Sequence, residues 1–390
     1  MFFAHEKESR LPQGFQTAVS NIGIRDETED FVCIHSVAPC RVAGVFTQSR
    51  FAGPSVKISR EHVADGRGQA IVIISKNANV ANGPQGERDA REVVERCAEQ
   101  LGIDDADVLI ASTGVIGRAY PMEKIRAHLA TLSEQFTEAN FSAAARGIMT
   151  TDTVPKMATV QIGNASLVGI AKGVGMIEPN MATLLTFFMT DAELPTEALT
   201  AIFKRVMDKT FNCLSIDTDT STSDSALILS NGLAGEVDLD AFEAALYQVS
   251  THLVKAIAKD GEGATKLIEV CVDQASSYRQ AKDVAKAIVN SPLVKTAVHG
   301  ADPNWGRVAM AIGKCEEEMD IQPESTTIRF CGFEVYPRSL SVADLEKLRH
   351  LLQQADINIH VSLGIGTEAA TVWGCDLSKG YVDINALYST

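Results

Sequence analysis

Long hydrophobic runs are absent from this sequence of 390 residues. The longest ones, Ile71 to Ile74 and Leu184 to Met189, fall far short of the roughly 18–20 apolar residues that a membrane helix needs. The first ten residues are followed by polar ones, so no apolar core of a secretory signal peptide is present. We therefore expect a protein that stays out of the membrane and works in the cytoplasm.

The sequence also lacks an excess of positive charge and a regular spacing of cysteines. Lys and Arg total 35 against 50 Asp and Glu, a formal net charge of −15, and no basic run is available to bind nucleic-acid phosphates. The eight cysteines include no Cys-x-x-Cys pair, which is typical of reduced thiols rather than of a disulfide framework or a zinc site. The histidines form no His-x-x-x-His pair and no triad pattern. We expect no nucleic-acid partner and no metal.

The remaining composition is that of an ordinary globular protein, with 45% apolar and 22% charged residues. Short apolar runs alternate with helical periodicity, which predicts an α/β or mixed α+β fold. Ala70 to Ser75 predicts a buried strand, and residues 159–170 predict a hairpin around Gly163-Asn164. Helices are predicted at 88–101, 122–132, 196–209 and 240–258.

Two local signals refine these predictions. Asp240, three positions before Glu243, is typical of a capping box and predicts that a helix begins there. Residues 380–384, Gly-Tyr-Val-Asp-Ile, predict a short strand just before the C-terminus.

A loop between Ser112 and Gly117 follows a predicted strand, where backbone N–H groups can face a ligand. Its glycines fit neither Gly-x-Gly-x-x-Gly nor Gly-x-x-x-x-Gly-Lys-Ser/Thr, so a phosphate site is rejected. Residues 217–224, Asp-Thr-Asp-Thr-Ser-Thr-Ser-Asp, resemble a calcium loop, but Thr222 and Ile228 stand where such a loop needs glycine and glutamate. This acidic segment is predicted to be either a solvated loop or polar structure near a site, without a catalytic role.

The stretch from Lys172 to Thr186 contains a candidate catalytic nucleophile. A segment with two glycines and a proline leads into Thr183, which opens an apolar run. A threonine hydroxyl becomes a good nucleophile when a base lies beside it, and its own α-amine is the nearest base once the preceding peptide bond is cut. Cleavage between Ala182 and Thr183 would therefore create a catalyst. The same residues also fit a loop that enters a buried strand, with Thr183 as an ordinary hydrogen-bonded hydroxyl.

Eight blocks in a fixed order favour the catalytic interpretation, because together they resemble the ornithine acetyltransferase family, also called glutamate N-acetyltransferases. The blocks span the chain from its first third to its last residue: 112–117 (Ser-Thr-Gly-Val-Ile-Gly), 149–153 (Met-Thr-Thr-Asp-Thr), Lys172-Gly173 with 181–184 (Met-Ala-Thr-Leu), 217–222, 260–263 (Asp-Gly-Glu-Gly), 290–296 (Asn-Ser-Pro-Leu-Val-Lys-Thr), 299–307 (His-Gly-Ala-Asp-Pro-Asn-Trp-Gly-Arg) and 385–390 (Asn-Ala-Leu-Tyr-Ser-Thr).

The resemblance implies a self-cleaving enzyme with an α chain, 1–182, and a β chain, 183–390. Within the β chain, about 183–285 would complete the core and about 286–390 would form a C-terminal part. The implied fold is the mixed α/β type that this family shares with self-processed aminopeptidases, with layered sheets flanked by helices. The implied assembly is an α2β2 heterotetramer that needs no cofactor.

The implied reaction moves acetyl from N2-acetyl-L-ornithine to L-glutamate through acetyl-Thr183, with Thr113 and Gly114 as the oxyanion hole. A lysine suits the α-carboxylate of both substrates, and a glutamate suits a cationic amine. Thr151 is a close second to Thr150 as a substrate contact. The implied substrate-binding residues are Thr150, Lys172, Thr183, Glu262, Asn385 and Thr390.

Two departures from the family pattern leave the acceptor open. Ser223 stands where many biosynthetic members carry asparagine, a variation that resembles relatives from secondary metabolism, and residues 178–180 (Glu-Pro-Asn) vary at positions that the family leaves loose. Two other function classes also remain open. Water could instead hydrolyse the same acyl-enzyme, which would make the protein an N-terminal-nucleophile amidase or aminopeptidase. An uncleaved relative could instead act as a binding protein.

Overall fold

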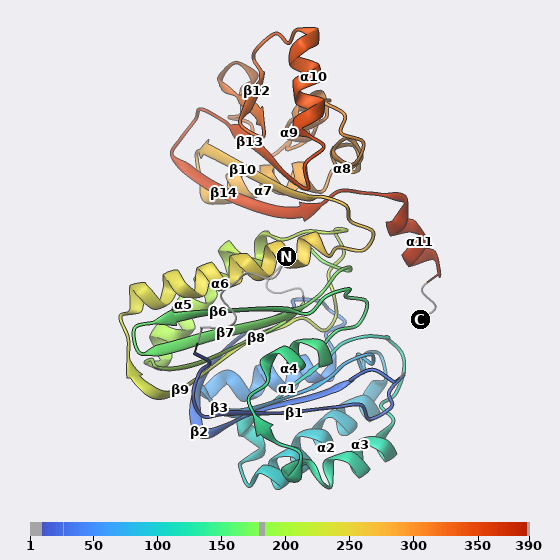
Figure 1. The fold of residues 1–390 in the computed structure, drawn as a ribbon, viewed down its shortest axis with the longest axis vertical. Coiled ribbons are helices and arrows are strands. Elements are labelled where there is room, and N and C mark those ends of the chain that lie inside the picture. The colour runs from blue at the N-terminus through green and yellow to red at the C-terminus, as the bar shows by residue number, and fades with distance from the viewer. Residues whose placement is uncertain (1–9, 26, 179–183, 388–390) are drawn as a thin grey trace.

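The computed structural model describes residues 10–25, 27–178 and 184–387. It shows a mixed α/β protein in which a large unit, built on one sheet, is followed by a smaller unit built on a second sheet (Figure 1). The strands of the large sheet are β1 (Phe15–Ser20), β2 (Phe31–Phe46), β3 (Arg67–Ile74), β4 (Val108–Ser112), β5 (Thr137–Glu138), β6 (Lys156–Ile162), β7 (Ala165–Lys172), β8 (Leu185–Glu193) and β9 (Ser225–Glu236).

Strand order in the large sheet is β4-β3-β2-β9-β8-β7-β6, with β1 beside β2 and β5 beside β1. Its strands are antiparallel except for the parallel pairs β3/β4 and β8/β9. The helices of this unit are α1 (Pro54–His62), α2 (Gly83–Leu101), α3 (Met122–Leu129), α4 (Phe141–Gly147), α5 (Thr196–Lys209) and α6 (Leu239–Lys259).

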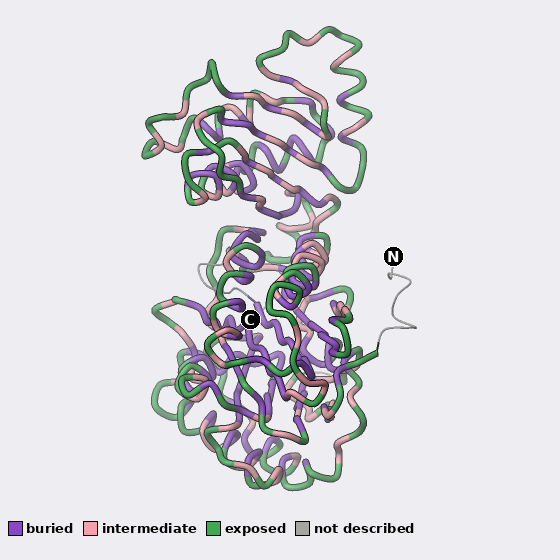
Figure 2. The backbone as a smooth tube through the Cα atoms, turned by 90° about the vertical axis from the view of Figure 1, so that its left-hand side faces the viewer, coloured by how far each residue is buried: buried purple, intermediate pink, exposed green. Residues whose placement is uncertain are grey.

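Both faces of the large sheet are buried, which explains why its central strands are continuous apolar runs rather than alternating ones. On β8, Phe187 packs into an inner core with strands β2 and β3, whereas Phe188 packs against α5 and α6 on the opposite face. On β3, Ile73 faces the same inner core and Val72 faces α2 and α3. Figure 2 shows the resulting buried interior and exposed outer helices.

The smaller unit contains β10 (Leu267–Ala275), β11 (Thr327–Phe330), β12 (Phe333–Tyr336), β13 (Asp356–Ser362) and β14 (Glu368–Cys375), in the order β12-β11-β13-β10-β14. Its helices are α7 (Tyr278–Val289), α8 (Pro292–His299), α9 (Gly306–Gly313) and α10 (Val342–Leu351). After β14 the chain leaves this sheet, and α11 (Lys379–Leu387) lies apart from it on the side of the large unit (Figure 1). Among the residues that the structure describes, no helix combines the length and apolar composition needed to cross a bilayer.

Most of the predicted elements are confirmed. The predicted strand at Ala70 to Ser75 is β3, the hairpin is β6 and β7 with Ile162 paired to Ala165, and the predicted helix at 196–209 is α5. The mixed α/β class is also confirmed. The second sheet begins with β10 at Leu267, earlier in the chain than the C-terminal part that the sequence places at about 286.

Two local predictions were wrong. Helix α6 begins one residue before Asp240, because Asp238 is the N-cap and its carboxylate accepts the N–H of Ala241 at 2.8 Å. The predicted strand at 380–384 is part of helix α11. The Ser378 hydroxyl accepts the N–H of Gly380 at 3.0 Å at the start of this helix, a local bond that favours a helical turn.

Candidate active site

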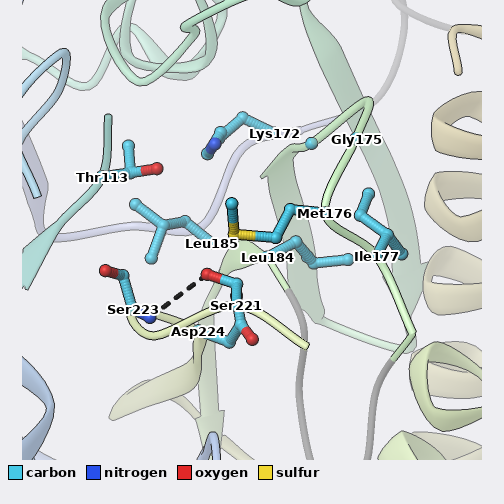
Figure 3. Close-up of a pocket in the computed structure, with 11 residues that line it drawn as sticks. Thr113, Lys172, Gly175, Met176, Ile177, Leu184, Leu185, Ser221, Ser223 and Asp224 are labelled. Carbon is cyan, nitrogen blue, oxygen red and sulfur yellow. Dashed lines mark hydrogen bonds between the residues drawn. The ribbon is translucent and has the colours of Figure 1, made fainter. Parts of the chain in front are cut away.

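A small pocket lies at the edge of the large sheet where β7 ends and β8 begins. Pairing of Lys172 with Leu185 and of Leu185 with Ser225 brings the end of β7 and the starts of β8 and β9 to this edge. The loop after β4 supplies the facing wall (Figure 3). The lining residues are Thr113, Lys172, Gly173, Gly175, Met176, Ile177, Leu184, Leu185, Ser221, Ser223 and Asp224.

Thr113 and Gly114 come directly after β4, in the loop that the sequence predicts to hold an oxyanion. Figure 3 shows the Thr113 hydroxyl directed toward the space beside Lys172. Gly114 has φ +127°, and a Cβ placed on it would lie 2.2 Å from the carbonyl carbon of Lys76. Only glycine fits this close approach of two backbone segments. The sequence therefore needs glycine here for steric reasons as well as for any catalytic one.

Thr150 and Lys172, two predicted substrate contacts, lie together. The Lys172 ammonium donates to the Thr150 hydroxyl at 3.2 Å. Desolvation lowers the pKa of Lys172, while the negative charges of Asp152, Asp224 and Glu262 oppose this shift. A cation in such a partly desolvated position binds a carboxylate more strongly than one on the open surface.

Glu262 and Asn385, two further predicted contacts, are hydrogen-bonded to each other. Asn385 on α11 donates its amide to the Glu262 carboxylate at 2.9 Å, and the Thr151 hydroxyl donates to the other oxygen at 3.1 Å. A Cβ on Gly175 would lie 2.4 Å from a Glu262 oxygen. The structure therefore brings Glu262 against the segment that contains Lys172, and the C-terminal helix reaches this place.

Three predicted site residues, Ala182, Thr183 and Thr390, lie outside the described residues. Leu184, which follows Thr183 in the chain, is buried and has φ +145°, a conformation that a branched side chain rarely adopts. Its carbonyl accepts the N–H of Ser225 at 3.0 Å. The chain is thus held in a strained conformation directly after the predicted cleavage position.

Asp217 holds the chain on the N-terminal side of the predicted cleavage position. Its carboxylate accepts the N–H groups of Met176 at 2.7 Å and Ile177 at 2.8 Å, and the hydroxyl of Tyr381 on α11 at 3.3 Å. The sequence suggested only polar structure for this acidic segment. The structure shows that it anchors both the segment before the predicted cleavage position and the C-terminal helix.

Asp224 is a pocket residue to which the sequence gave no role. Its side chain is buried, and one carboxylate oxygen has no hydrogen-bond partner among the described residues. Burial raises the pKa of Asp224 well above its usual value, although the Ser221 hydroxyl and the Lys172 charge act in the opposite direction. The final position in the acidic segment 217–224 was the only sequence signal for it.

The described residues contain no group of three or more His, Cys, Asp and Glu side chains arranged to hold a metal ion. His299, which stands in the block 299–307, lies in the smaller unit with its Nδ1 2.7 Å from the buried Asp376 carboxylate. Outside the pocket, this pair ties α8 to the segment after β14.

The Thr113 hydroxyl and the desolvated Lys172 ammonium line one pocket, and the anchored Glu262 carboxylate lies against the segment that contains Lys172; this set of groups suits an acyltransferase. The chain belongs to the ArgJ family, whose family model matches residues 16–390. The Arginine biosynthesis bifunctional protein ArgJ 2 of Nostoc sp. is 63% identical over 98% of this chain and 99% of its own length. The Glutamate N-acetyltransferase Oat2 of Streptomyces clavuligerus is 55% identical over 98% of both chains. The crystal structure of the Arginine biosynthesis bifunctional protein argJ from Bacillus halodurans is 38% identical, covers 51% of this chain and 96% of its own, and has a TM-score of 0.48.

Proposed function

We propose that this chain is a glutamate N-acetyltransferase that moves acetyl from N2-acetyl-L-ornithine to L-glutamate through an acetyl ester on Thr183. The observation that supports this most strongly is a shared pocket wall. Thr113, Lys172 and Leu184, the residue that follows Thr183 in the chain, line the same pocket. A nucleophile, an oxyanion donor and a carboxylate-binding cation are the groups that such a reaction requires.

Self-cleavage between Ala182 and Thr183 would produce the α chain, 1–182, and the β chain, 183–390. The Asp217 contacts hold the chain before this bond, and the strained Leu184 follows it. A non-glycine residue in such a conformation stores about 1–3 kcal/mol. Anchors on both sides, with strain beside the scissile bond, support cleavage at this place.

Acetyl transfer would then proceed in two half-reactions. The α-amine of Thr183 takes the proton of its own hydroxyl, and the oxygen attacks the acetyl carbonyl of acetylornithine. Negative charge develops on the carbonyl oxygen, where the Thr113 hydroxyl and the Gly114 N–H would donate. Ornithine leaves with the proton on its nitrogen. The amine of glutamate attacks the acetyl ester in turn, and Thr183 regains its proton.

Substrate binding is assigned to the charged groups around the pocket. Lys172, with Thr150 beside it, would bind the α-carboxylate that both substrates carry. Glu262, held by Thr151 and Asn385, would bind the cationic side-chain amine of acetylornithine. Thr390 would complete the C-terminal contact. Location in the cytoplasm and assembly as an α2β2 heterotetramer are further parts of the proposal, and native mass spectrometry tests the assembly.

The direct test is a product assay with acetylornithine in the presence and absence of glutamate. We expect ornithine and N-acetylglutamate in equal amounts, with little turnover when glutamate is withheld. Free acetate formed at the same rate without glutamate would identify a hydrolase instead. Transfer to another amine but not to glutamate would favour the secondary-metabolism acceptor suggested by Ser223.

Thr113→Ala tests the oxyanion hole. We expect kcat to fall by roughly 10²–10³-fold with little change in KM, because the hydroxyl would meet charge that exists only in the transition state. Thr113→Ser, which keeps the hydroxyl, is the control and should retain most of the activity. Steady-state kinetics with both substrates measures the difference, and a loss confined to KM would assign Thr113 to substrate binding instead.

A further inference from the structure

A buried cluster of three charged side chains lies behind the pocket, outside its lining. Asp152 stands in the loop between α4 and β6, Lys156 begins β6, and Asp260 follows α6. The Lys156 ammonium lies 2.7 Å from Asp152 and 2.6 Å from Asp260. The three side chains are 0%, 1% and 6% exposed, so neither solvent nor a bound substrate would reach them.

Each carboxylate of this cluster also holds backbone that leads to a predicted substrate contact. Asp152 accepts the N–H of Thr150 at 3.1 Å and the N–H of Gly173, the residue after Lys172, at 2.7 Å. Asp260 accepts the N–H of Thr153 at 3.1 Å and stands two residues before Glu262. The cluster therefore joins three segments that are far apart in the sequence.

Burying three charges is expensive unless each is paired and hydrogen-bonded. A turn made of apolar residues could stabilise these loops equally well, so stability alone gives little reason for charges here. Carboxylates accepting backbone N–H groups do, however, fix the directions of those segments, and the ion pairs fix the distance between the segments. Such fixed geometry is what a binding site for a small charged molecule requires.

We propose that Asp152, with Lys156 and Asp260, is a positioning residue that holds Thr150, Lys172 and Glu262 at the spacing of a bound amino acid. The inference rests on the proposed function, since it takes these three residues as substrate contacts. Asp152 acts on the carboxylate-binding pair Thr150 and Lys172, and Asp260 acts on Glu262. None of the three cluster residues touches the substrate.

Asp152→Asn is the main test. Asparagine keeps the size of the side chain but has one acceptor oxygen instead of two, so the N–H of Thr150 or of Gly173 loses its partner. The Lys156–Asp260 pair stays balanced, and we expect the variant to fold. KM for both substrates should rise about tenfold to a hundredfold while kcat changes little, because binding in the ground and transition states is lost equally. The dissociation constant of L-ornithine, measured by calorimetry, should rise by the same factor.

The pH profile separates positioning from a general loss of stability. Lys172 is faced by the negative Asp152, Asp224 and Glu262 and by the positive Lys156. Removing the Asp152 charge lowers the pKa of Lys172 further, so the fall of kcat/KM on the alkaline side should begin at a lower pH than in the wild type.

Asp191→Asn is the matched control. Asp191 is a buried carboxylate in the same sheet that accepts two backbone N–H groups, from Gln13 at 3.0 Å and Ser166 at 2.7 Å, near the opposite end of β8. The Asp191→Asn variant should have the KM values, the ornithine dissociation constant and the alkaline fall of kcat/KM of the wild type. Asp260→Asn is the second variant and should raise KM for acetylornithine more than KM for glutamate.

The outcomes distinguish the two proposals. Wild-type protein without acetyl transfer would refute the proposed function, and ornithine calorimetry would still test the cluster. Wild-type transfer with unchanged KM, ornithine binding and pH profile in Asp152→Asn would overturn the cluster proposal alone. Equal changes in Asp191→Asn would also overturn it. If Asp152→Asn fails to fold, Asp260→Asn takes its place. Kinetics and ornithine binding that are unchanged in Asp260→Asn would then overturn the cluster proposal.

Discussion

Replacing Thr183 by alanine should leave the chain uncut and lower acetyl transfer by about 10⁴-fold or more. Alanine has no hydroxyl to attack either the acetyl carbonyl or the preceding peptide bond, and loss of a nucleophile removes the covalent route altogether. Mass spectrometry of the purified protein measures cleavage directly. The wild type should give fragments 1–182 and 183–390, whereas Thr183→Ala should give the single 41.9 kDa chain.

Two control variants make this result specific. Thr183→Ser keeps a hydroxyl and should still cut and transfer, more slowly. Thr186→Ala removes a neighbouring hydroxyl in β8 that donates to the Ile170 carbonyl at 3.2 Å, and it should be cut at the normal position. A β chain that begins at any residue other than Thr183 contradicts the assignment. An uncut wild-type chain without transfer would favour a binding protein.

The fold was predictable where one short stretch of sequence determines the structure. The continuous apolar run of β3 and the two-residue turn between β6 and β7 are local signals, and both were confirmed. Helix α11 was not predictable in this way. Val382 and Ile384 alternate as in a strand, but both are exposed. The helix is held instead by the contacts of Tyr381 with Asp217 and of Asn385 with Glu262, which link residues far apart in the chain.

The site likewise combines residues that a local sequence pattern predicts with residues whose position depends on contacts between distant parts of the chain. Glycine at 114 and threonine at 113 stand in a recognisable block, and the structure places Thr113 in the pocket wall. Asp152 also stands in one of the blocks, 149–153, and Asp224 ends the acidic segment 217–224, but neither pattern predicts burial, because an aspartate in a polar loop is usually exposed. Their burial follows from tertiary contacts, namely Gly173 and Lys156 around Asp152 and the pocket wall around Asp224. Sequence shows that these residues are acidic, but only the assembled fold shows which backbone they hold.

Deleting residues 385–390 should abolish acetyl transfer while self-cleavage survives at least in part. The deletion removes Asn385, whose amide donates to Glu262 at 2.9 Å, together with the predicted contact Thr390. Among the described residues, Glu262 would keep the Thr151 hydroxyl as a side-chain donor but lose the Asn385 amide. The proposed cleavage would depend on Thr183 and on anchors such as Asp217, which lie outside the deleted segment, so fragments 1–182 and 183–384 should still form.

Point variants identify the contact that matters. Asn385→Asp replaces a donor by a carboxylate facing Glu262, and the repulsion should raise KM for acetylornithine by about tenfold to a hundredfold. Val382→Asp adds the same charge to an exposed position of the same helix and serves as the matched control, with KM near the wild-type value.

Gly263→Ala tests docking of the helix without altering the helix itself. Gly263 has φ +69°, and a Cβ there would lie 2.2 Å from the backbone nitrogen of Tyr381. Alanine should therefore push α11 away from Glu262 and reproduce much of the loss caused by the deletion. Kinetics of the truncated protein decide the assignment: full transferase activity without residues 385–390 would show that the C-terminal helix packs beside the site but does not take part in it.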